Sequence, residues 1–172
     1  SSSTDLEGNL LRFGRILGDG IARTIAGMEW EAAGSLEWRV ASFPFPSSAA
    51  KLQAVRATLA DPAESSARKR IAAPVLAAME YPANASYRLS LLSLGSASVL
   101  FLPGEPFVEY QIHAQSLVPD RFLALAANCG DDFLYLPTAE AFSQGGYEVE
   151  AFCWCTPEIE EQLHGALARV LE

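Results

Sequence analysis

An apolar segment that stops at a proline and a glycine constrains the fold of the second half of this sequence. Residues 87–93 and 97–102 are strand-like runs on either side of Gly95, and the second run ends at Leu102-Pro103-Gly104-Glu105. Two such runs around a glycine predict a β-hairpin, and the Pro-Gly pair predicts a tight turn directly after it. The carboxylate of Glu105 is therefore expected beyond the end of a strand, where α/β proteins commonly gather their binding groups.

The first third of the chain predicts a helix followed by a strand. Residues 5–27 carry apolar side chains at three- and four-residue spacing, and a capping box at Thr4-Asp5-Leu6-Glu7 opens this helix. The apolar stripe is expected to pack on the body of the protein. In residues 35–45, Leu36, Trp38 and Val40 alternate with charged side chains, which predicts an edge or connecting strand with one solvated face.

Five further helices and two short strands complete the prediction. The helix that follows Asp61-Pro62 is expected to reach residue 79, with an interruption near Pro74. The strand at 122–127 is nearly all apolar, which predicts a place at the centre of a sheet that helices cover. The remaining elements are helices at 47–60, at 107–118, after Thr138 and from Thr156-Pro157 onward, and an extended segment around Tyr135.

The composition indicates a globular protein with a large core. The chain has 172 residues, of which 50% are hydrophobic and 19% are charged, and this excludes intrinsic disorder. A formal net charge of −9 with scattered Lys and Arg argues against a nucleic-acid partner. No uncharged apolar run reaches the roughly 18 to 20 residues of a transmembrane helix, so no transmembrane segment is predicted.

Three cysteines leave the disulfide state open. Cys153 and Cys155 are separated by one residue and would point to opposite faces of a strand, so a bridge between them is not expected. A bridge from Cys129 to either of them is an open alternative. Buried free thiols are the favoured interpretation, because cysteine is among the most frequently buried residue types.

A group of polar and aromatic residues follows the Pro-Gly-Glu turn at fixed offsets. These residues are Tyr135, Thr138, Glu140, Phe142, Tyr147 and Glu148. Together with Gly104-Glu105, their order and spacing resemble the catalytic domain of the neutral ceramidase family, including its shorter bacterial relatives. The resemblance covers the second half of the chain well and the first half only in style. It implies an α/β fold, layered α/β/α with a mixed sheet, and makes residues 1–172 a single-domain segment from the C-terminal part of a larger domain.

The resemblance also implies a zinc site. In the family, a Pro-Gly-Glu turn supplies a zinc-binding glutamate and a later tyrosine supplies a second protein ligand; here these positions are Glu105 and Tyr135. The residues that would line the pocket or support the ligands are Gly104, Thr138, Tyr147 and Glu148. The family's two zinc-binding histidines precede the segment that residues 1–27 resemble, so upstream residues would complete the zinc shell and supply the catalytic groups.

The activity implied by the family is zinc-dependent hydrolysis of an N-acyl amide bond, with a small-molecule or lipid-like amide as substrate. The missing N-terminal part of the same domain would be the partner of this segment, which is expected to be inactive alone. A secreted or periplasmic location is suggested by the same resemblance. The rival hypothesis is a non-catalytic scaffold that binds a ligand or a partner, because two oxygen ligands without imidazoles make a weak zinc site.

Simpler roles exist for the same residues. Glu105 could merely complement a helix dipole, and Tyr135 could be an ordinary buried tyrosine. Glu105, Glu109 and His113 recur every four residues, which predicts an alternative metal site on one helix face. The polar loop at 128–132 could approach the site.

Two further sequence features limit the chemistry. His164 is expected at the surface or at a helix cap of the terminal helix. The sequence contains no Gly-x-Ser-x-Gly elbow, and neither histidine has the context of a nucleophilic triad. A hydrolase built on this chain should therefore depend on a metal.

Overall fold

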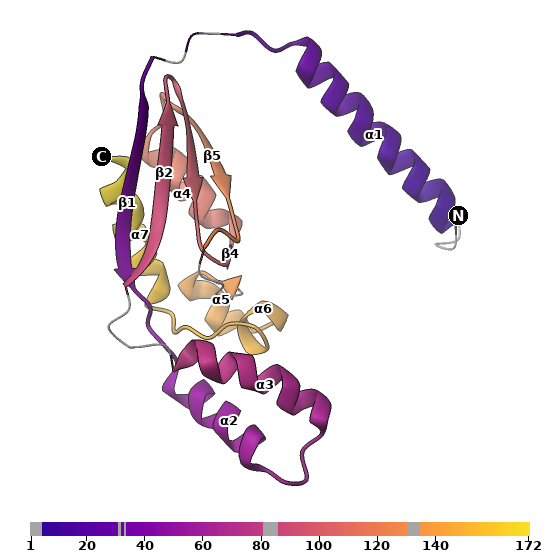
Figure 1. The fold of residues 1–172 in the computed structure, drawn as a ribbon, viewed down its shortest axis with the longest axis vertical. Coiled ribbons are helices and arrows are strands. Elements are labelled where there is room, and N and C mark those ends of the chain that lie inside the picture. Colours follow the sequence, from indigo (N-terminus) through magenta and orange to yellow (C-terminus); the bar gives the residue numbers. More distant parts are fainter. Residues whose placement is uncertain (1–4, 31, 33, 81–85, 131–134) are drawn as a thin grey trace. The chain divides into compact units, whose positions relative to one another are not determined.

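The chain folds into two units, residues 1–33 and residues 34–172 (Figure 1). The computed structural model describes residues 5–30, 32, 34–80, 86–130 and 135–172.

Helix α1 (Leu6–Ala26) makes up most of the first unit. Asp5 caps it, since its Oδ1 accepts a hydrogen bond of 2.9 Å from the amide of Gly8, and the helix ends at Gly27 as predicted. The predicted cap Thr4 lies outside the described residues, and Asp5 takes its place because any short oxygen-bearing side chain can bind a free amide there. No residue of α1 is buried. Packing of its apolar stripe therefore stays a prediction.

Four strands form the main sheet of the second unit. They are β1 (Leu36–Pro44), β2 (Ser86–Leu94), β3 (Ala97–Phe101) and β5 (Phe122–Ala126), in the order β1-β2-β3-β5. The pairs β1/β2 and β2/β3 are antiparallel, and β3/β5 is parallel. The predicted hairpin is confirmed, with Gly95 in the left-handed region at φ 58°. The α/β class and the mixed sheet are also confirmed.

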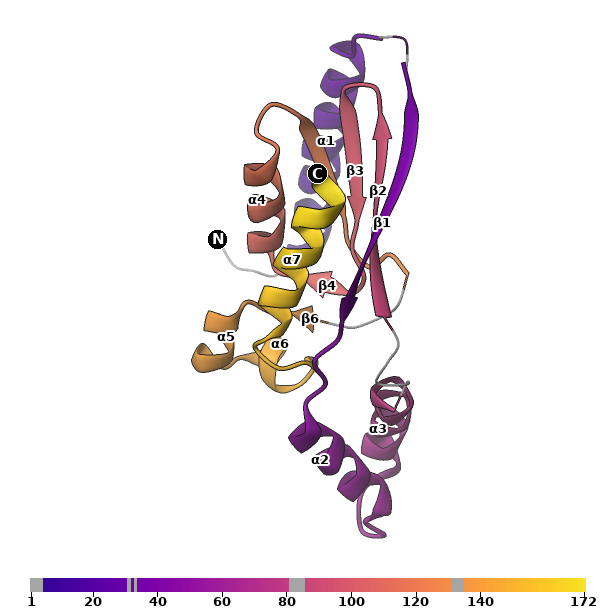
Figure 2. The same cartoon turned by 90° about the vertical axis from the view of Figure 1, so that its left-hand side faces the viewer.

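Helices α4 (Val108–Leu117) and α7 (Ile159–Leu171) cover one face of this sheet (Figure 2). The predicted stripe of α7 is buried there, and β2 and β3 alternate buried and more exposed residues because one face of each strand meets the helices. The core between the layers consists chiefly of Phe43, Leu89, Leu91, Leu100, Tyr110, Ala114, Leu163, Leu167 and Val170.

The opposite face of the sheet is apolar and exposed in the described part of the chain. The rings of Trp38 and Phe101 contact each other on this face in a tilted arrangement, with 5.6 Å between ring centroids. The predicted inward face of β1 is wrong: Leu36, Trp38 and Val40 are exposed, whereas Ala41 and Phe43 are buried under α7. The alternation occurs as predicted, but which side of the strand is buried depends on which face of the sheet α7 covers.

Strand β5 lies at the edge of the described sheet, although its composition predicted the centre. Phe122, its first residue, is exposed. Strand β1 occupies the other edge, as predicted. An apolar run thus predicted a strand here but not its position, because the uncovered face of this sheet is apolar too.

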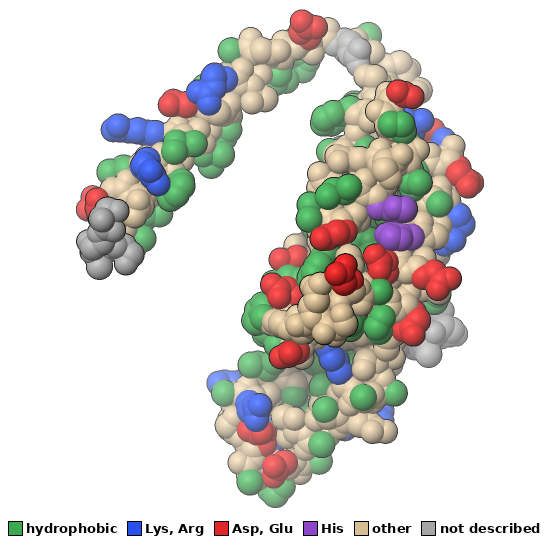
Figure 3. Space-filling model, turned by 180° about the vertical axis from the view of Figure 1, so that it is seen from behind, with side chains coloured by type: hydrophobic (Ala, Val, Ile, Leu, Met, Phe, Trp, Pro, Cys, Tyr) green, Lys and Arg blue, Asp and Glu red, His purple; other side chains and the backbone are tan. Residues whose placement is uncertain are grey.

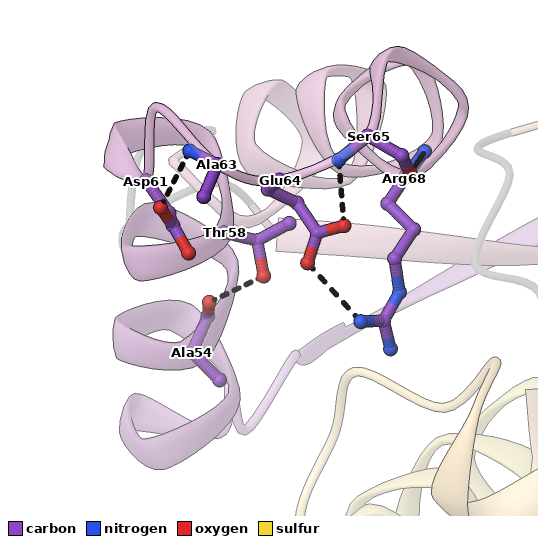
Figure 4. A network of polar contacts seen from close by, with 7 residues as sticks. All are labelled: Ala54, Thr58, Asp61, Ala63, Glu64, Ser65 and Arg68. Atoms are coloured by element: carbon purple, nitrogen blue, oxygen red, sulfur yellow. Dashed lines mark hydrogen bonds and ion pairs between the residues drawn. The ribbon is translucent and has the colours of Figure 1, made fainter.

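Helices α2 (Ala49–Ala60) and α3 (Ser66–Met79) form a helical hairpin. The predicted start of α3 at Pro62 is wrong, because Asp61 ends α2 and turns the chain by accepting a 2.8 Å hydrogen bond from the amide of Ala63. Helix α3 begins after Ser65 and continues through Pro74. Figure 4 shows Glu64 bonding both the Ser65 amide, at 2.7 Å, and Arg68, at 3.1 Å.

Four short elements complete the described part of the second unit. Strands β4 (Glu105–Pro106) and β6 (Tyr135–Leu136) pair in parallel, and helices α5 (Ala139–Gln144) and α6 (Tyr147–Glu150) follow β6. The sequence did not predict α6. Within the described ranges, no helix has both the length and the apolar character needed to span a bilayer.

The segment that contains two of the cysteines is irregular. Cys153 has no regular secondary structure, and Cys155 forms an isolated bridge with Ser47. Their sulfur atoms lie 3.3 Å apart, so the prediction that the side chains point to opposite faces is wrong. The alternation of faces holds only in an extended strand. Cys153 and Cys155 are buried free thiols, and Cys129 is a half-buried one.

Candidate functional site

Glu105 and Tyr135 are direct partners in the two-stranded sheet of β4 and β6. Partners in register project their side chains to the same face, so the carboxylate and the phenol are neighbours. Partial removal from water raises the pKa of Tyr135, and the charge of Glu105 and a hydrogen bond from the phenol to that carboxylate raise it further. The structure thus brings together the two residues that the sequence proposed as metal ligands.

The turn at Gly104 sets the position of Glu105. Gly104 has φ 63°, a left-handed conformation that glycine adopts without steric cost. Its carbonyl accepts a hydrogen bond of 2.6 Å from the amide of Asn128, and the carbonyl of Leu102 accepts one of 2.9 Å from Cys129. The start of the polar loop therefore lies against the turn, as the sequence suggested, whereas Asp131 and Asp132 lie outside the described residues.

Three hydrogen bonds fix the strand that carries Tyr135. The amide of Tyr135 donates to the carbonyl of Phe152 at 3.1 Å, and the amide of Phe107 donates to Leu136 at 3.1 Å. The buried hydroxyl of Tyr110 in α4 donates to the carbonyl of Pro137 at 2.9 Å. Strand β6 is therefore anchored on both sides although it has only two residues.

An aromatic cluster adjoins the phenol of Tyr135. The ring of Tyr147 meets it edge-on at 5.9 Å between centroids and approaches Phe152 at 5.0 Å. Tyr147 is 58% exposed and opens α6 directly after Gly145 and Gly146, which have φ 73° and 109°. The charge of Glu148 also contributes to the raised pKa of Tyr135. Tyr147 and Glu148 thus lie where the sequence proposed pocket residues.

Two residues of this region were missed by sequence reasoning. Thr138 stands at the cap position of α5 as predicted, but its side chain makes no capping bond. Instead, Oε2 of Glu160 in α7 accepts a 2.8 Å hydrogen bond from the amide of Ala139. The other residue is Phe152, whose carbonyl accepts a hydrogen bond from the amide of Tyr135 and whose ring contacts Tyr147. No local spacing in the sequence signals either contact. Glu160 reaches α5 from helix α7, and Phe152 reaches Tyr135 from the segment after α6.

The alternative metal site on one helix face is wrong. Glu105 belongs to β4, and α4 begins only at Val108, so Glu105 does not share a helix with Glu109 and His113. His113 stacks on His164 at 3.8 Å between ring centroids. Figure 3 shows the two histidines, in purple, side by side among acidic side chains.

His164 is half-buried in this stack, with part of its side chain at the surface, and it lies within α7 rather than at a helix cap. Burial lowers its pKa, the neighbouring His113 lowers it further, and the carboxylate of Glu160 opposes both effects. Two stacked imidazoles present their faces to each other, whereas metal binding requires their nitrogen atoms to converge.

The donors beside β4 and β6 fit part of a zinc shell. Zinc takes four ligands from imidazole, thiolate and carboxylate groups in most protein sites. Glu105 offers a carboxylate, and Tyr135 offers a phenol that would need a cation to ionise, because its pKa is raised. Among the residues that the structure describes, no three His, Cys, Asp or Glu side chains form a metal-binding group. The remaining ligands would have to come from elsewhere.

The architecture defines an α/β protein, and comparison with solved structures identifies the fold more closely. The chain is similar to neutral ceramidase from Pseudomonas aeruginosa, with a TM-score of 0.61, 15% sequence identity and 99% of this chain covered. That alignment covers 33% of the ceramidase chain, so the present chain spans about a third of its length. A ceramidase complexed with C2 also matches 50% of this chain and 14% of its own, with a TM-score of 0.44 and 14% identity.

The sequence itself matches no protein-family model and no curated protein. The likeness is therefore one of fold. It confirms the resemblance to neutral ceramidases at that level and extends it from the second half of the sequence to nearly the whole chain.

Proposed function

We propose that this chain is the C-terminal part of a zinc-dependent hydrolase that cleaves an N-acyl amide bond. The pairing of Glu105 with Tyr135 in register carries the proposal. Tyr147 and Glu148 adjoin that pair, and the fold is shared with neutral ceramidase. Residues that are far apart in the sequence thus meet in the combination that the family resemblance implied.

Glu105 and Tyr135 would hold the metal together with two histidines from the preceding part of the domain. Zinc, when bound, supplies a positive centre that polarises the acyl carbonyl. In the described state the phenol of Tyr135 keeps its proton and donates a hydrogen bond to the Glu105 carboxylate. Ligation would require Oη of Tyr135 to release that proton, and the charge of a metal ion favours this release.

Tyr147 would form one wall of the substrate pocket. Its ring is held against Tyr135 and Phe152, yet more than half of the side chain is exposed. An aromatic face of this kind can bind an apolar chain or lie over an amide. A small-molecule or lipid-like amide is the substrate class that such an aromatic wall suits.

The second candidate is a non-catalytic scaffold that binds a ligand or a partner through the same surface. The donor set favours it, because two oxygen ligands without imidazoles bind zinc weakly. No described group of three metal-binding side chains supplements them. The two hypotheses differ in whether the charge of Glu105 is needed for metal content and activity.

Substitution of Glu105 by Gln tests the proposal in the protein expressed together with its preceding segment. The change keeps the size of the side chain and removes its charge. Loss of a supporting residue commonly lowers metal affinity or activity about 10–100-fold, and loss of a ligand should cost at least as much. Bound zinc and N-acyl amide hydrolysis would be measured, with the melting temperature as a check of the fold.

Glu109→Gln is the matched control. Glu109 is exposed in the first turn of α4 and should tolerate the same change with zinc content and hydrolysis unaltered. If the Glu105 variant keeps full zinc content and full activity, the hydrolase proposal is wrong and the scaffold hypothesis is preferred.

A further inference from the structure

A pair of buried thiols lies outside the site described above. The sulfur atoms of Cys153 and Cys155 are 3.3 Å apart, and each residue is 1% exposed. The segment around them is held by backbone bonds to the start of α2, from Ser48 to the carbonyl of Trp154 at 3.0 Å and from Thr156 to that of Pro46 at 2.8 Å. The two sulfur atoms therefore stay close because both flanks of the pair are fixed.

The two thiols have different surroundings. The hydrogen bond from Cys155 stabilises the thiolate of Cys153, and with the nearby charge of Lys51 it lowers the pKa of Cys153 to about 7. The same pairing and burial raise the pKa of Cys155. The Nζ of Lys51 donates hydrogen bonds to the carbonyls of Val149 and Cys153, which keep the ammonium group beside the pair. Of the two thiols, Cys153 is therefore the one that ionises more readily.

A pocket is lined in part by Cys153. It has a volume of about 360 Å³ and is lined by Lys51, Arg68, Cys153 and Trp154 among other residues. The pocket lies between the α2–α3 hairpin and the segment that begins at the end of α6, and its lining includes no residue of β4 or β6. A hydroperoxide is small enough to enter it.

We propose that Cys153 and Cys155 are a redox site that forms a reversible disulfide when a hydroperoxide enters this pocket. The Cys153 thiolate attacks the peroxide, so an S–O bond forms while the O–O bond breaks and water or an alcohol leaves after protonation. Cys155 then attacks the sulfur of the Cys153 sulfenic acid. The S–S bond forms, the S–O bond breaks, and the departing hydroxyl takes the Cys155 proton to leave as water.

The bridge would be easy to reverse. The two thiols are oxidised by two electrons in total and the peroxide is reduced by two. A bridge between cysteines with one residue between them closes a very small ring, and strained disulfides have higher reduction potentials than structural ones. A low-molecular-weight thiol such as glutathione is the reductant class that would restore both thiols.

Peptide mass spectrometry of the whole chain tests this site directly. Cleavage after Glu150 and Glu158 releases residues 151–158, which contain both thiols and exclude Cys129. After hydrogen peroxide treatment and alkylation, this peptide should lack two hydrogens and carry no alkyl group. Treatment with a thiol reductant should then return it to the doubly alkylated form. A peptide that stays doubly alkylated after peroxide, or that becomes linked to Cys129, overturns the proposal.

Single substitutions separate the roles of the two thiols. Cys155→Ser should trap the sulfenic acid on Cys153, where a dimedone-type reagent labels it, whereas Cys153→Ser should leave Cys155 unlabelled. Cys129→Ser should not alter the peptide result. Equal labelling at both positions would overturn the roles assigned to the two thiols. If a variant folds poorly, the mass of the peptide from the unsubstituted protein still shows whether the disulfide forms.

Discussion

Tyr110 donates a buried hydrogen bond of 2.9 Å to the carbonyl of Pro137, and thereby ties the helix-covered core to the candidate site. Tyr110 is fully buried in α4 and packs against the ring of His164 at 5.6 Å. Pro137 follows β6, so the bond holds the chain two residues after Tyr135. The position of Tyr135 therefore depends on a residue of the core.

Tyr110→Phe should destabilise the protein by about 1–3 kcal/mol, because it leaves the buried carbonyl of Pro137 without its donor. Chemical denaturation would measure the change. The control, Tyr147→Phe, also removes a tyrosine hydroxyl, but from an exposed ring, and should alter the free energy of unfolding by less than about 0.5 kcal/mol. Equal effects of the two changes would mean that the Pro137 bond contributes nothing.

The same residue should make the protein sensitive to alkali. Burial raises the pKa of Tyr110 above its ordinary value of 10.0 in the folded state. As the pH rises, the unfolded chain loses the Tyr110 proton before the folded chain does. The contribution of Tyr110 to the free energy of unfolding is therefore fully present below this value and is lost as the pH rises through and above it. The unfolding midpoint of the native chain should fall more steeply in this range than that of Tyr110→Phe. Equal falls of the unfolding midpoint with pH in the two proteins would argue against this contribution of Tyr110.

The stacked histidines should make the protein sensitive to acid. His164 has a pKa below its ordinary value of 6.5, through burial and through His113. The unfolded chain therefore takes up the His164 proton first, and stability is lost as the pH falls below 6.5 toward the folded pKa. His164→Phe keeps a ring in the stack without titrating. The urea midpoint of unfolding would be measured above and below pH 6.5 for both proteins. The fall in midpoint between the two pH values should be smaller in His164→Phe than in the native protein, and an equal fall would contradict the prediction.

Gly104→Ala should cost about 1–2 kcal/mol, because a side chain in the left-handed conformation meets the following carbonyl. Gly165→Ala in α7 is the control. Its Cβ would meet Arg169 at 3.4 Å, an ordinary contact, and alanine favours a helix over glycine by up to about 1 kcal/mol. Thermal unfolding of both variants would compare them. A Gly104 variant as stable as the control would remove the argument for a strained turn.

Local patterns in the sequence predicted much of the fold. The hairpin around Gly95 and the turn at Gly104 depend on neighbouring residues, and both occur as predicted. The pairing of Glu105 with Tyr135 could be anticipated only through the family resemblance, since no period in the sequence connects them. Whether the pair binds zinc stays a prediction.

The errors have a common physical origin in contacts between distant segments. Which face of β1 is buried depends on where α7 lies, and the meeting of His113 with His164 depends on how α4 packs against α7. Glu160 caps α5 from another helix for the same reason. The proximity of Cys153 and Cys155 depends on an irregular backbone that alternation rules do not cover.

The brevity of β4 and β6 has a consequence for the order in which the protein folds. Each strand has two residues, and about thirty residues, including α4 and β5, separate Glu105 from Tyr135. Their meeting requires a long loop to close, whereas the hairpin of β2 and β3 forms from adjacent residues. We therefore expect the site to assemble after the hairpin. It can also open by local unfolding while the four-stranded sheet stays intact, so a chain that retains its secondary structure can still lack a site.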